Sequence, residues 1–384
     1  MKKILWFGDG AVPTGFAKVN HSIIENLPEG EFDIHHVAIN YYGDPHEHKW
    51  KLYPAAAKGD LYGFGRIPEF AEKDFDGIFI LNDPWMIDRY LTEIRKHWKK
   101  IPPIIVYFPV DSEQLSEGWF GSYDLVSAAV TYTKFGESQV PPSIKNLHVI
   151  PHGVDTGTFF KTHDNIVEAK KLIFGDKDDF INSFIILSAQ RNQPRKRLDI
   201  TMEAFSLFAK DKPENVKLYL HCGTKDAGWD LFDMAAKLRI DKRLIITSKN
   251  RNIAAIPVSR LNAVYNASDV GINTSLGEGW SLTNHEHAAT GAPQIVPQHS
   301  ALTELYQGCG YLVESKYHQY NVDTHTLSRI VTPEDVASAM ELAYTNKELR
   351  EYLAYQSYNK FSSETYQWKN IVEKRWLPLF REVF

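Results

Sequence analysis

Residues 277–293 read GEGWSLTNHEHAATGAP, and this stretch decides which fold and which chemistry the sequence predicts. It holds two glutamates, Glu278 and Glu286, with seven residues between them. The apolar run VGIN comes just before it, and SLTNHEHAAT has the composition of a helix that stops at a Gly-x-Pro sequence. The stretch is therefore predicted to be a strand, then a glycine-flanked loop with the first acid, then a helix with the second.

The same alternation of strand and helix extends along the whole chain. Predicted strands of the first half lie at 4–7, 34–39, 77–81, 104–108, 126–132 and 147–150, and those of the second half at 184–189, 216–222, 244–247, 270–273, 294–296 and 311–313. Predicted helices between them include 16–27, 86–98, 198–209, 231–238, 259–266 and 282–289. The strand runs are continuously apolar, as in parallel strands covered on both faces. The predicted fold class is α/β, with two doubly wound, Rossmann-like domains and a polar break near 159–178.

The composition is that of a soluble globular protein. The chain has 384 residues, which is more than one hydrophobic core usually serves. Of these residues, 43% are apolar and 24% are charged. The formal net charge of −5 argues against a protein that grips nucleic acid mainly through phosphates, although a local basic patch stays open. Two cysteines, Cys222 and Cys309, indicate neither a disulfide framework nor a zinc site.

The sequence also predicts where the protein resides. Its first apolar run is too short for a signal peptide, and no stretch approaches the ~20 apolar residues of a membrane span. We therefore expect a cytoplasmic protein without a transmembrane segment, for which peripheral contact with a membrane stays open.

Loops that follow predicted strands matter most, because parallel sheets bind ligands at the carboxyl ends of their strands. Gly8, Gly10 and Gly15 precede a predicted helix, where they could let backbone N–H groups approach a phosphate or could simply form a tight turn. Asp111 could serve as a base or accept a sugar hydroxyl, or it could cap the next helix. His152 could line a cleft between the domains or stabilise a turn.

The loop after the first strand of the second half is basic. Arg191, Arg195, Lys196 and Arg197 stand within seven residues. Charge runs usually mark a solvated surface. At a strand end they also suit a diphosphate, because Arg can bridge two oxygens and Lys acts as a point charge. We favour phosphate binding for this loop.

The two acids complete a hypothesis for the site. The helix is predicted to begin near Ser281, so its first backbone N–H groups would face phosphate oxygens. Glu278 would point at the group beyond the phosphates, and Glu286 could accept two hydrogen bonds from a ribose diol. A surface acid and a dipole-complementing acid would explain Glu286 alone, but not Glu278, its glycines and the basic loop. Together these features describe a nucleotide-sugar site.

These motifs resemble those of one known family, the group 1 (GT4-like) glycosyltransferases of GT-B fold. Its members carry a pattern close to E-G-[FW]-[GS]-L-x-x-x-E-A-x-A-x-G-x-P, matched here by residues 278–282, Glu286, Ala288, Gly291 and Pro293. They also carry an Arg and then Arg-Lys after the first strand of the second domain, and a P-N-G-V-D…F segment between the domains. These are matched by Arg191, Arg195, Lys196, residues 151–155 and Phe159.

The resemblance implies an architecture and a set of roles. Two Rossmann-like domains, 1–160 and 161–360, would face each other across a cleft, with a terminal helix in 361–384 that packs on the first domain. The implied catalytic residues are Glu278, Lys196, Arg191 and Asp111. The implied donor-binding residues are Gly15, Arg191, Lys196, Asn252, Glu278, Gly279, Trp280, Ser281, Leu282 and Glu286. The expected acceptor-side residues are Asp111, His152 and Tyr41.

The sequence departs from the family pattern at three places. Asp111 lies in a loop where many members have a His, so it takes over an acceptor contact or marks an unusual acceptor. The first loop has the single glycine Gly15 where a pair is usual. His287 stands where a small residue is usual.

The implied activity is transfer of a sugar from a nucleotide sugar, a UDP-sugar first of all, to an acceptor hydroxyl. The resemblance implies retention of configuration and no metal or other cofactor. The acceptor stays open among a glycan, a lipid, a protein and a modified nucleobase of DNA. Two further classes stay open as alternatives: a non-catalytic protein that binds nucleotide sugars or carbohydrates, and an epimerase or phosphorylase of the same fold.

Overall fold

The computed structural model describes residues 1–56, 59–163, 165–254 and 256–384. The chain forms two compact units. The first contains Met1–Val110, Gln114–Gly153 and Trp368–Phe384, and the second contains Asp111–Glu113 and Val154–Gln367. The chain thus passes between the units more than once, and its last residues return to the first unit.

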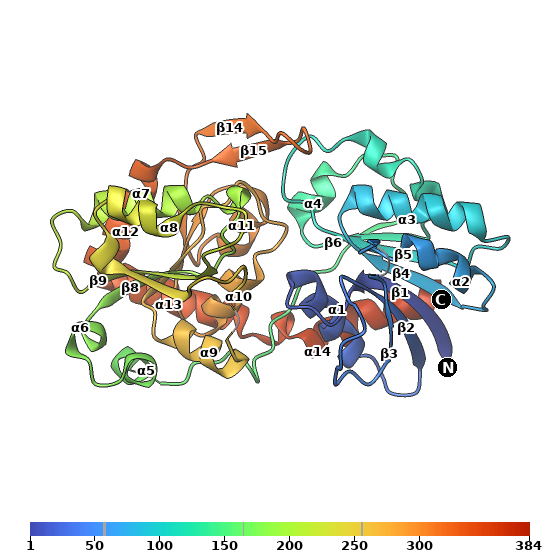
Figure 1. The fold of residues 1–384 in the computed structure, drawn as a ribbon, viewed down its shortest axis with the longest axis horizontal. Helices are drawn as coiled ribbons and strands as arrows, with labels where there is room; N and C mark the ends of the chain where they lie inside the picture. Colours follow the sequence, from blue (N-terminus) through green and yellow to red (C-terminus); the bar gives the residue numbers. More distant parts are fainter. Residues whose placement is uncertain (57–58, 164, 255) are drawn as a thin grey trace. The chain divides into compact units, whose positions relative to one another are not determined.

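The first unit is built on a seven-stranded parallel sheet of order β3-β2-β1-β4-β5-β6-β7 (Figure 1). The strands are β1 (Lys2–Asp9), β2 (Phe32–Ile39), β3 (Lys51–Pro54), β4 (Gly77–Leu81), β5 (Ile104–Phe108), β6 (Ala128–Thr131) and β7 (Leu147–Val149). The helices are α1 (Gly15–Glu25), α2 (Ile67–Ala71), α3 (Pro84–His97), α4 (Lys134–Gln139), α14 (Trp368–Ile371) and α15 (Leu377–Val383).

Aromatic rings join the C-terminal helices to this sheet. The Trp6 ring stacks on Phe79 with centroids 3.8 Å apart. Trp376 is fully buried and meets Phe79 and Tyr107 edge-on, at 5.5 and 4.7 Å. Phe380 adds a further edge contact to Trp6. Because each buried ring removes a large apolar area from water, residues 368–384 form part of the core of the first unit.

The second unit contains a six-stranded parallel sheet of order β10-β9-β8-β11-β12-β13 and a separate antiparallel hairpin, β14-β15 (Figure 1). The strands are β8 (Phe184–Ser188), β9 (Val216–Gly223), β10 (Leu244–Ser248), β11 (Val270–Ile272), β12 (Gln294–Pro297), β13 (Tyr311–Val313), β14 (Tyr317–Tyr320) and β15 (Leu327–Ile330). The helices are α5 (Ile166–Phe174), α6 (Asp178–Ile181), α7 (Leu198–Ala209), α8 (Leu231–Lys237), α9 (Val258–Asn266), α10 (Leu282–Ala289), α11 (Ser300–Tyr306), α12 (Pro333–Thr345) and α13 (Lys347–Phe361).

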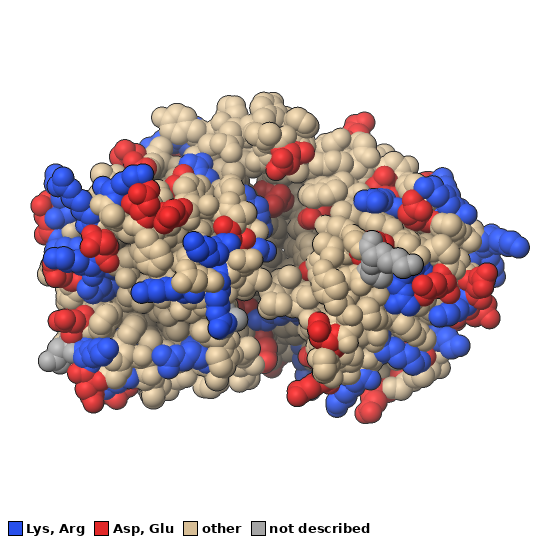
Figure 2. Space-filling view, viewed as in Figure 1, with Lys and Arg blue, Asp and Glu red and all other residues tan. Residues whose placement is uncertain are grey.

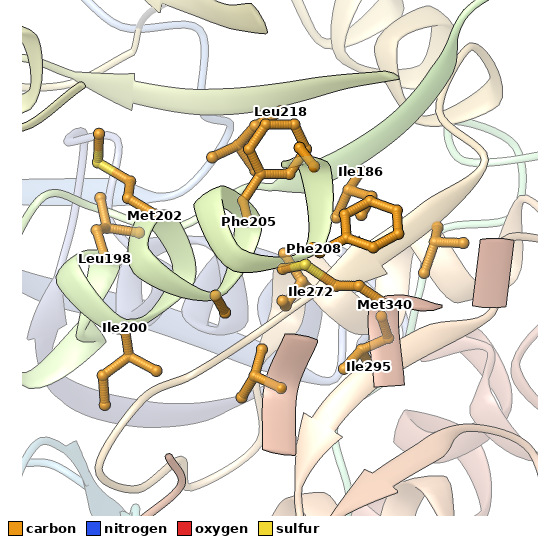
Figure 3. Close-up of a cluster of buried hydrophobic side chains, with 14 of the residues drawn as sticks. Ile186, Leu198, Ile200, Met202, Phe205, Phe208, Leu218, Ile272, Ile295 and Met340 are labelled. Atoms are coloured by element: carbon orange, nitrogen blue, oxygen red, sulfur yellow. The ribbon is translucent and has the colours of Figure 1, made fainter. Parts of the chain in front are cut away.

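The hydrophobic core of this unit lies between the sheet and helices α7 and α12. Figure 3 shows Phe205 and Phe208 of α7 among side chains of the strands, with Met340 of α12 beside them. Apolar residues of α7 recur at helical spacing, and those of β8 and β11 are continuous, so each element buries the residues that its pattern predicts.

Local signals fix where several helices begin. Thr14 precedes α1 and its side chain accepts a hydrogen bond from the Ala17 amide, as expected of an N-cap. Asp230 caps α8 in the same way through two amides. Thr332 caps α12, where Pro333 occupies a first-turn position that needs no amide hydrogen.

The prediction of two doubly wound α/β domains is confirmed, and every predicted strand is present with its ends shifted by no more than a few residues. Several short elements were not predicted, among them strand β3, the hairpin β14-β15 and helix α5. Strand β3 and the hairpin β14-β15 are short and polar, so they lack a continuous apolar run. Helix α5 lies inside the predicted polar break, of which residue 164 falls outside the described residues. The units divide at 153/154 and 367/368, whereas the predicted boundaries were 160/161 and 360/361.

The predicted C-terminal helix is interrupted. A π-helical turn at Val372–Trp376 separates α14 from α15. Pro378 lies in the first turn of α15 and has no amide hydrogen, so one carbonyl upstream loses its α-helical partner.

On the face drawn in Figure 2, basic and acidic side chains both occur over each unit. Among the described residues, every helix is too short or too polar to cross a bilayer.

We predict that Trp376→Ala destabilises the first unit by about 3 kcal/mol or more, because it removes a fully buried indole and leaves a cavity beside Phe79 and Tyr107. Calorimetric unfolding checks this through the midpoint temperature and enthalpy. Tyr42→Ala, at an exposed aromatic of the same unit, is the matched control and should shift the midpoint little. Equal shifts in the two variants would contradict the assignment of residues 368–384 to this core.

Candidate functional site

The candidate site lies in the second unit, at the point where the strand order of the parallel sheet reverses. Strand order runs from β8 through β9 to β10 on one side, and from β11 through β12 to β13 on the other. Strands β8 and β11 are neighbours, so the loops after them flank the switch point at which doubly wound sheets bind ligands. The basic loop follows β8 and the glycine-flanked acid follows β11, as the sequence predicts.

A buried ion pair joins these two loops. Lys196 Nζ donates to Glu278 Oε1 at 2.6 Å, and the two residues are 8% and 4% exposed. The same oxygen accepts from Asn273 Nδ2 and Ser275 Oγ, both at 2.9 Å. Among the described residues Oε2 accepts no such bond, and its nearest cation is Arg195 Nη1 at 3.8 Å. One oxygen of the carboxylate is therefore saturated and the other is available.

Charge and burial set the protonation of this pair. Burial lowers the pKa of Lys196 to about 8, and the neighbouring Arg195 adds to that shift. For Glu278, burial alone would raise the pKa, but the charges of Lys196 and Arg195 and the hydrogen bonds from Lys196 and Asn273 outweigh it and lower the pKa to about 2. Glu278 is therefore ionised at neutral pH, and Lys196 loses its charge at only mildly alkaline pH.

Arg195 adds a second positive charge at the edge of the pair. Its guanidinium donates to the Gly277 carbonyl at 3.3 Å and lies 3.9 Å from Asp111 Oδ2. Asp111 belongs to the short segment that groups with the second unit. A Cβ on Gly277 would lie 1.8 Å from the Asp111 carbonyl oxygen, so only glycine fits there. Close packing, rather than a left-handed backbone, explains this glycine before Glu278.

Helix α10 starts at the same place. Ser281 occupies the cap position with φ +71°, a left-handed conformation that is uncommon for a residue with a side chain. Its hydroxyl does not cap the helix but donates to Asn284 Oδ1 at 2.7 Å. Trp280 is buried and its indole donates to His285 Nδ1 at 2.7 Å. The first amides of α10, from Leu282 onward, have no partner within the helix.

The second acid of the motif, Glu286, is directed at helix α9. Its Oε2 accepts from the Tyr265 hydroxyl at 3.1 Å, and it is buried. His287 stacks on the same Tyr265 ring with centroids 5.2 Å apart. The role of Glu286 at a ribose stays a prediction.

The remaining predicted residues of this unit are more peripheral. Arg191 is exposed, and its guanidinium makes two hydrogen bonds to Asp226, at 2.8 and 3.0 Å. Asn252 lies after β10, where its backbone approaches Gly223 so closely that a Cβ on Gly223 would lie 2.5 Å from it. Gly279 is half-buried in the loop between Glu278 and Trp280.

Three predicted residues belong to the first unit. Gly15 is the first residue of α1. Tyr41 is buried and donates its hydroxyl to the Asp44 carbonyl. His152 is buried among the rings of Tyr107, Tyr132 and Trp368, 4.1 to 5.7 Å away. Their acceptor-side roles stay predictions.

Sequence reasoning missed a set of buried polar side chains beneath the ion pair: Gln190, Asn273, Ser275, Asn284 and Gln294. The available signal was an Asn at the end of an apolar strand and an Asn inside an otherwise buried helix. It also missed Tyr265 as the partner of Glu286. Among the described residues there is no cluster of three or more acidic, His or Cys side chains that could hold a metal ion.

Comparison with known proteins identifies proteins that are similar to this chain. Residues 183–324 match the model of the family Glycosyl transferases group 1. The mannosylfructose-phosphate synthase of Agrobacterium fabrum is 26% identical over 159 residues, which cover 41% of this chain and 34% of that protein. The aligned stretch thus spans about a third of the length of this curated relative.

Solved structures match the whole chain. Sucrose-phosphate synthase from Thermosynechococcus elongatus has a TM-score of 0.76 at 14% identity, over 100% of this chain and 99% of that one. HepE of Anabaena in complex with UDP-glucose has a TM-score of 0.71 at 15% identity, over 99% and 100%. At these identities the likeness shows the fold, which is the GT-B fold. The predicted resemblance to group 1 glycosyltransferases is confirmed, whereas the GT4 subfamily stays a prediction.

We predict that Lys196→Met lowers the free energy of unfolding by about 3 kcal/mol at pH 7, because it leaves the buried Glu278 carboxylate without its closest cation. Glu278→Gln should cost less, because Lys196 can release its proton when unpaired. Urea denaturation of both variants and of the double variant measures this. The double variant should be more stable than the sum of the single losses predicts; strict additivity would show that the pair is not coupled.

Proposed function

We propose that the protein transfers a sugar from a nucleoside diphosphate sugar to an acceptor hydroxyl, on the ground that residues 183–324 match the model of the family Glycosyl transferases group 1. The donor would bind at the switch point of the second sheet. The observation that carries the proposal is the divided Glu278 carboxylate, with one oxygen held by Lys196, Asn273 and Ser275 and the other free to accept.

The free oxygen suits a sugar hydroxyl. A carboxylate oxygen accepts hydrogen bonds and donates none, so it matches a ring that presents hydroxyl groups. Since Oε1 is already fixed by three donors, binding a sugar at Oε2 needs no rearrangement of the carboxylate. Such preorganisation matters, because a group that is already oriented contributes without a further loss of side-chain freedom.

The groups around the proposed diphosphate position carry positive charge. Lys196 and Arg195 supply two charges next to Glu278, and the first amides of α10, which have no partner within the helix, add the positive end of a helix dipole. When the bond between sugar and diphosphate breaks, negative charge grows on the leaving phosphate. Preoriented cations and amides around it would stabilise this charge, which is the kind of term that contributes most to transfer chemistry.

The finer features of the reaction belong to the same proposal. HepE of Anabaena has been solved with UDP and with UDP-glucose, which supports a UDP-sugar as the first donor to try. The resemblance of the paired-acid motif supports retention of configuration and a reaction without a metal. Glu286 would hold the ribose, and the GT4 subfamily would be the chain's place within group 1. The acceptor would be a hydroxyl of a glycan, a lipid, a protein or a modified nucleobase.

We predict that Glu278→Ala and Lys196→Ala each lower the rate of sugar transfer by ~10²-fold, the scale of losing one transition-state contact. Release of UDP and the mass of the product, over a panel of UDP-sugars and acceptor hydroxyls, measure this. Lys237→Ala, at an exposed lysine of α8, is the control and should keep full activity.

The outcomes separate the alternatives. Conversion of a donor to its epimer without any acceptor would favour an epimerase, and tight donor binding without turnover would favour a non-catalytic binder. Full activity in both Glu278→Ala and Lys196→Ala would contradict the site, whatever the donor.

We predict that UDP binding weakens as pH rises above about 8, because the pKa of Lys196 lies near 8 in the free protein and the anionic diphosphate raises it. Below that pH Lys196 is protonated with and without ligand, so it contributes no pH dependence to the affinity. Above it, binding must take up a proton and the Kd should rise by up to tenfold per pH unit. Calorimetry in buffers of different ionisation enthalpy measures the proton uptake.

The control for this pH dependence is Lys196→Arg, whose guanidinium stays charged throughout the range. It shares every other titrating group, including those of UDP, so the difference between the two proteins isolates Lys196. The same loss of affinity above pH 8 in Lys196→Arg would contradict the assignment.

A further inference from the structure

A network of buried amide and hydroxyl side chains lies directly beneath the ion pair. It joins the carboxyl ends of β8 and β11 to helix α10 and strand β12. Its members are Gln190, Asn273, Ser275, Ser281, Asn284 and Gln294, all buried. Of these, Ser281 alone is a defined position of the motif that identified the site.

Asn273 connects Glu278 to the rest of the network. Its Nδ2 lies 2.9 Å from Glu278 Oε1, 3.1 Å from Ser281 Oγ and 3.0 Å from Asn284 Oδ1. Its Oδ1 accepts from the backbone amide of Ser275 at 2.8 Å. The hydroxyl of Ser275 is also within 2.9 Å of Glu278 Oε1. Asn273 therefore holds the carboxylate directly and again through Ser275.

Asn284 connects the start of α10 to the neighbouring strands. Its Oδ1 accepts from Ser281 Oγ at 2.7 Å and from Gln190 Nε2 at 2.9 Å, and it lies 3.0 Å from Asn273 Nδ2. Its Nδ2 donates to Gln294 Oε1 at 2.8 Å. Gln294 in turn donates to the Ala292 carbonyl. Asn284 thus meets a residue of β12, the loop after β8, the residue after β11 and the cap of its own helix.

Such a network destabilises the folded state unless each of its buried polar atoms has a hydrogen-bond partner. A buried amide that lacks a partner costs about 1–3 kcal/mol, whereas apolar side chains of similar size would carry no such risk. The fold even makes room for it. A Cβ on Gly271 of β11 would lie 1.9 Å from Gln294 Oε1, so the strand leaves out a side chain where the amide sits.

The left-handed turn at Ser281 is held by the same groups. A non-glycine residue at φ +71° persists only where its surroundings over-determine it. Ser281 Oγ accepts from Asn273 and donates to Asn284, so both asparagines hold this turn. The turn sets the direction in which α10 begins, and with it the direction of the first amides of the helix.

We propose that Asn273 and Asn284 are positioning residues for the sugar and diphosphate ends of the donor site. Asn273 fixes the Glu278 carboxylate so that Oε2 faces the ligand. Asn284 fixes the turn at Ser281 so that the first amides of α10 face the phosphates. This inference rests on the proposed function for the identity of the ligand, but the geometry of the two asparagines stands apart from it.

The sharpest test of Asn273 is a double-mutant cycle with Glu278. Asn273→Ala should lower kcat about tenfold or more and raise the Kd of UDP less than Asn284→Ala does, because Ser281 keeps its hydrogen bond to Asn284. In the Glu278→Ala background the same change should have no further effect on kcat, because Asn273 acts through that carboxylate. An equal loss of kcat in both backgrounds would overturn the proposal. Asn273→Asp, which keeps the volume and the acceptor for Ser275, serves where Asn273→Ala fails to fold.

Substitution of Asn284 should change the Kd of UDP more than it changes kcat. Asn284→Ala releases the turn at Ser281 while Asn273 still bonds to Glu278, so the Kd of UDP should rise about tenfold, by analogy with the loss of a charge-assisted contact. The control is Asn262→Ala, which removes a buried amide of α9 that bonds to Phe160 and Asn266 and to no member of the network. It should lower stability and leave both the Kd and kcat unchanged. Equal effects on the Kd in Asn284→Ala and Asn262→Ala would overturn the role of Asn284.

Crystal structures of the Asn273→Ala and Asn284→Ala variants test the two positioning roles without any measurement of turnover. In Asn273→Ala the Glu278 carboxylate should leave its present orientation, and in Asn284→Ala Ser281 should leave the left-handed region. An unchanged Glu278 and Ser281 would overturn the proposal even if the protein transfers sugar. Failure of the proposed function would instead appear as absence of turnover in the unmodified chain, with the geometric result unaffected.

Discussion

The second unit is organised around one buried ion pair, Lys196 with Glu278. Removing two charges from water costs several kcal/mol for each ion, and their attraction repays this only when geometry is good and the remaining lone pairs are satisfied. Here one carboxylate oxygen takes three donors and the other takes none among the described residues. A pair kept for stability alone would be expected to satisfy both oxygens. The asymmetry is what a site needs if one oxygen is to stay available for a ligand.

Several features of the surrounding fold help to keep one oxygen of the Glu278 carboxylate bonded and the other available. The pair lies at the switch point between β8 and β11, where loops from neighbouring strands diverge and leave space. Gly277 has no side chain because the Asp111 carbonyl occupies its place, and Gly271 has none because Gln294 does. Ser281 accepts an unfavourable backbone conformation where α10 begins. These three departures from ordinary packing lie in the strand that precedes Glu278, beside Glu278 itself, and at the start of the helix that follows it.

The sequence predicted the parts of this arrangement that depend on local pattern. Continuous apolar runs located the strands that are buried on both faces, and the motif located both Lys196 and Glu278. It did not predict that they pair, because contact between residues 82 positions apart is a property of the fold. Asn273 and Asn284 were missed for a related reason: polarity in a sequence predicts exposure, and only the packed structure shows that these side chains are buried. Arg191 was assigned to a diphosphate from its charge, its place after a strand and the family motif. In the structure its guanidinium bonds to Asp226, and its role at a diphosphate stays a prediction. The hairpin β14-β15 was missed because its strands are polar.

If a diphosphate binds at the site, Lys196, Arg195 and Arg191 would have different roles. Lys196 is committed to Glu278 by a short bond, so its main effect is to orient that carboxylate. Arg195 lies 3.8 Å from Glu278 and 3.9 Å from Asp111, beyond hydrogen-bond distance from either, and is half-exposed. Turning it toward a phosphate would break no short charge-assisted bond to a carboxylate. Arg191 would have to leave a two-pronged contact with Asp226, although exposure weakens that contact. On energetic grounds Arg195 is therefore the cation most readily redirected to an incoming anion, and Lys196 is the one that keeps the acid in place while this happens.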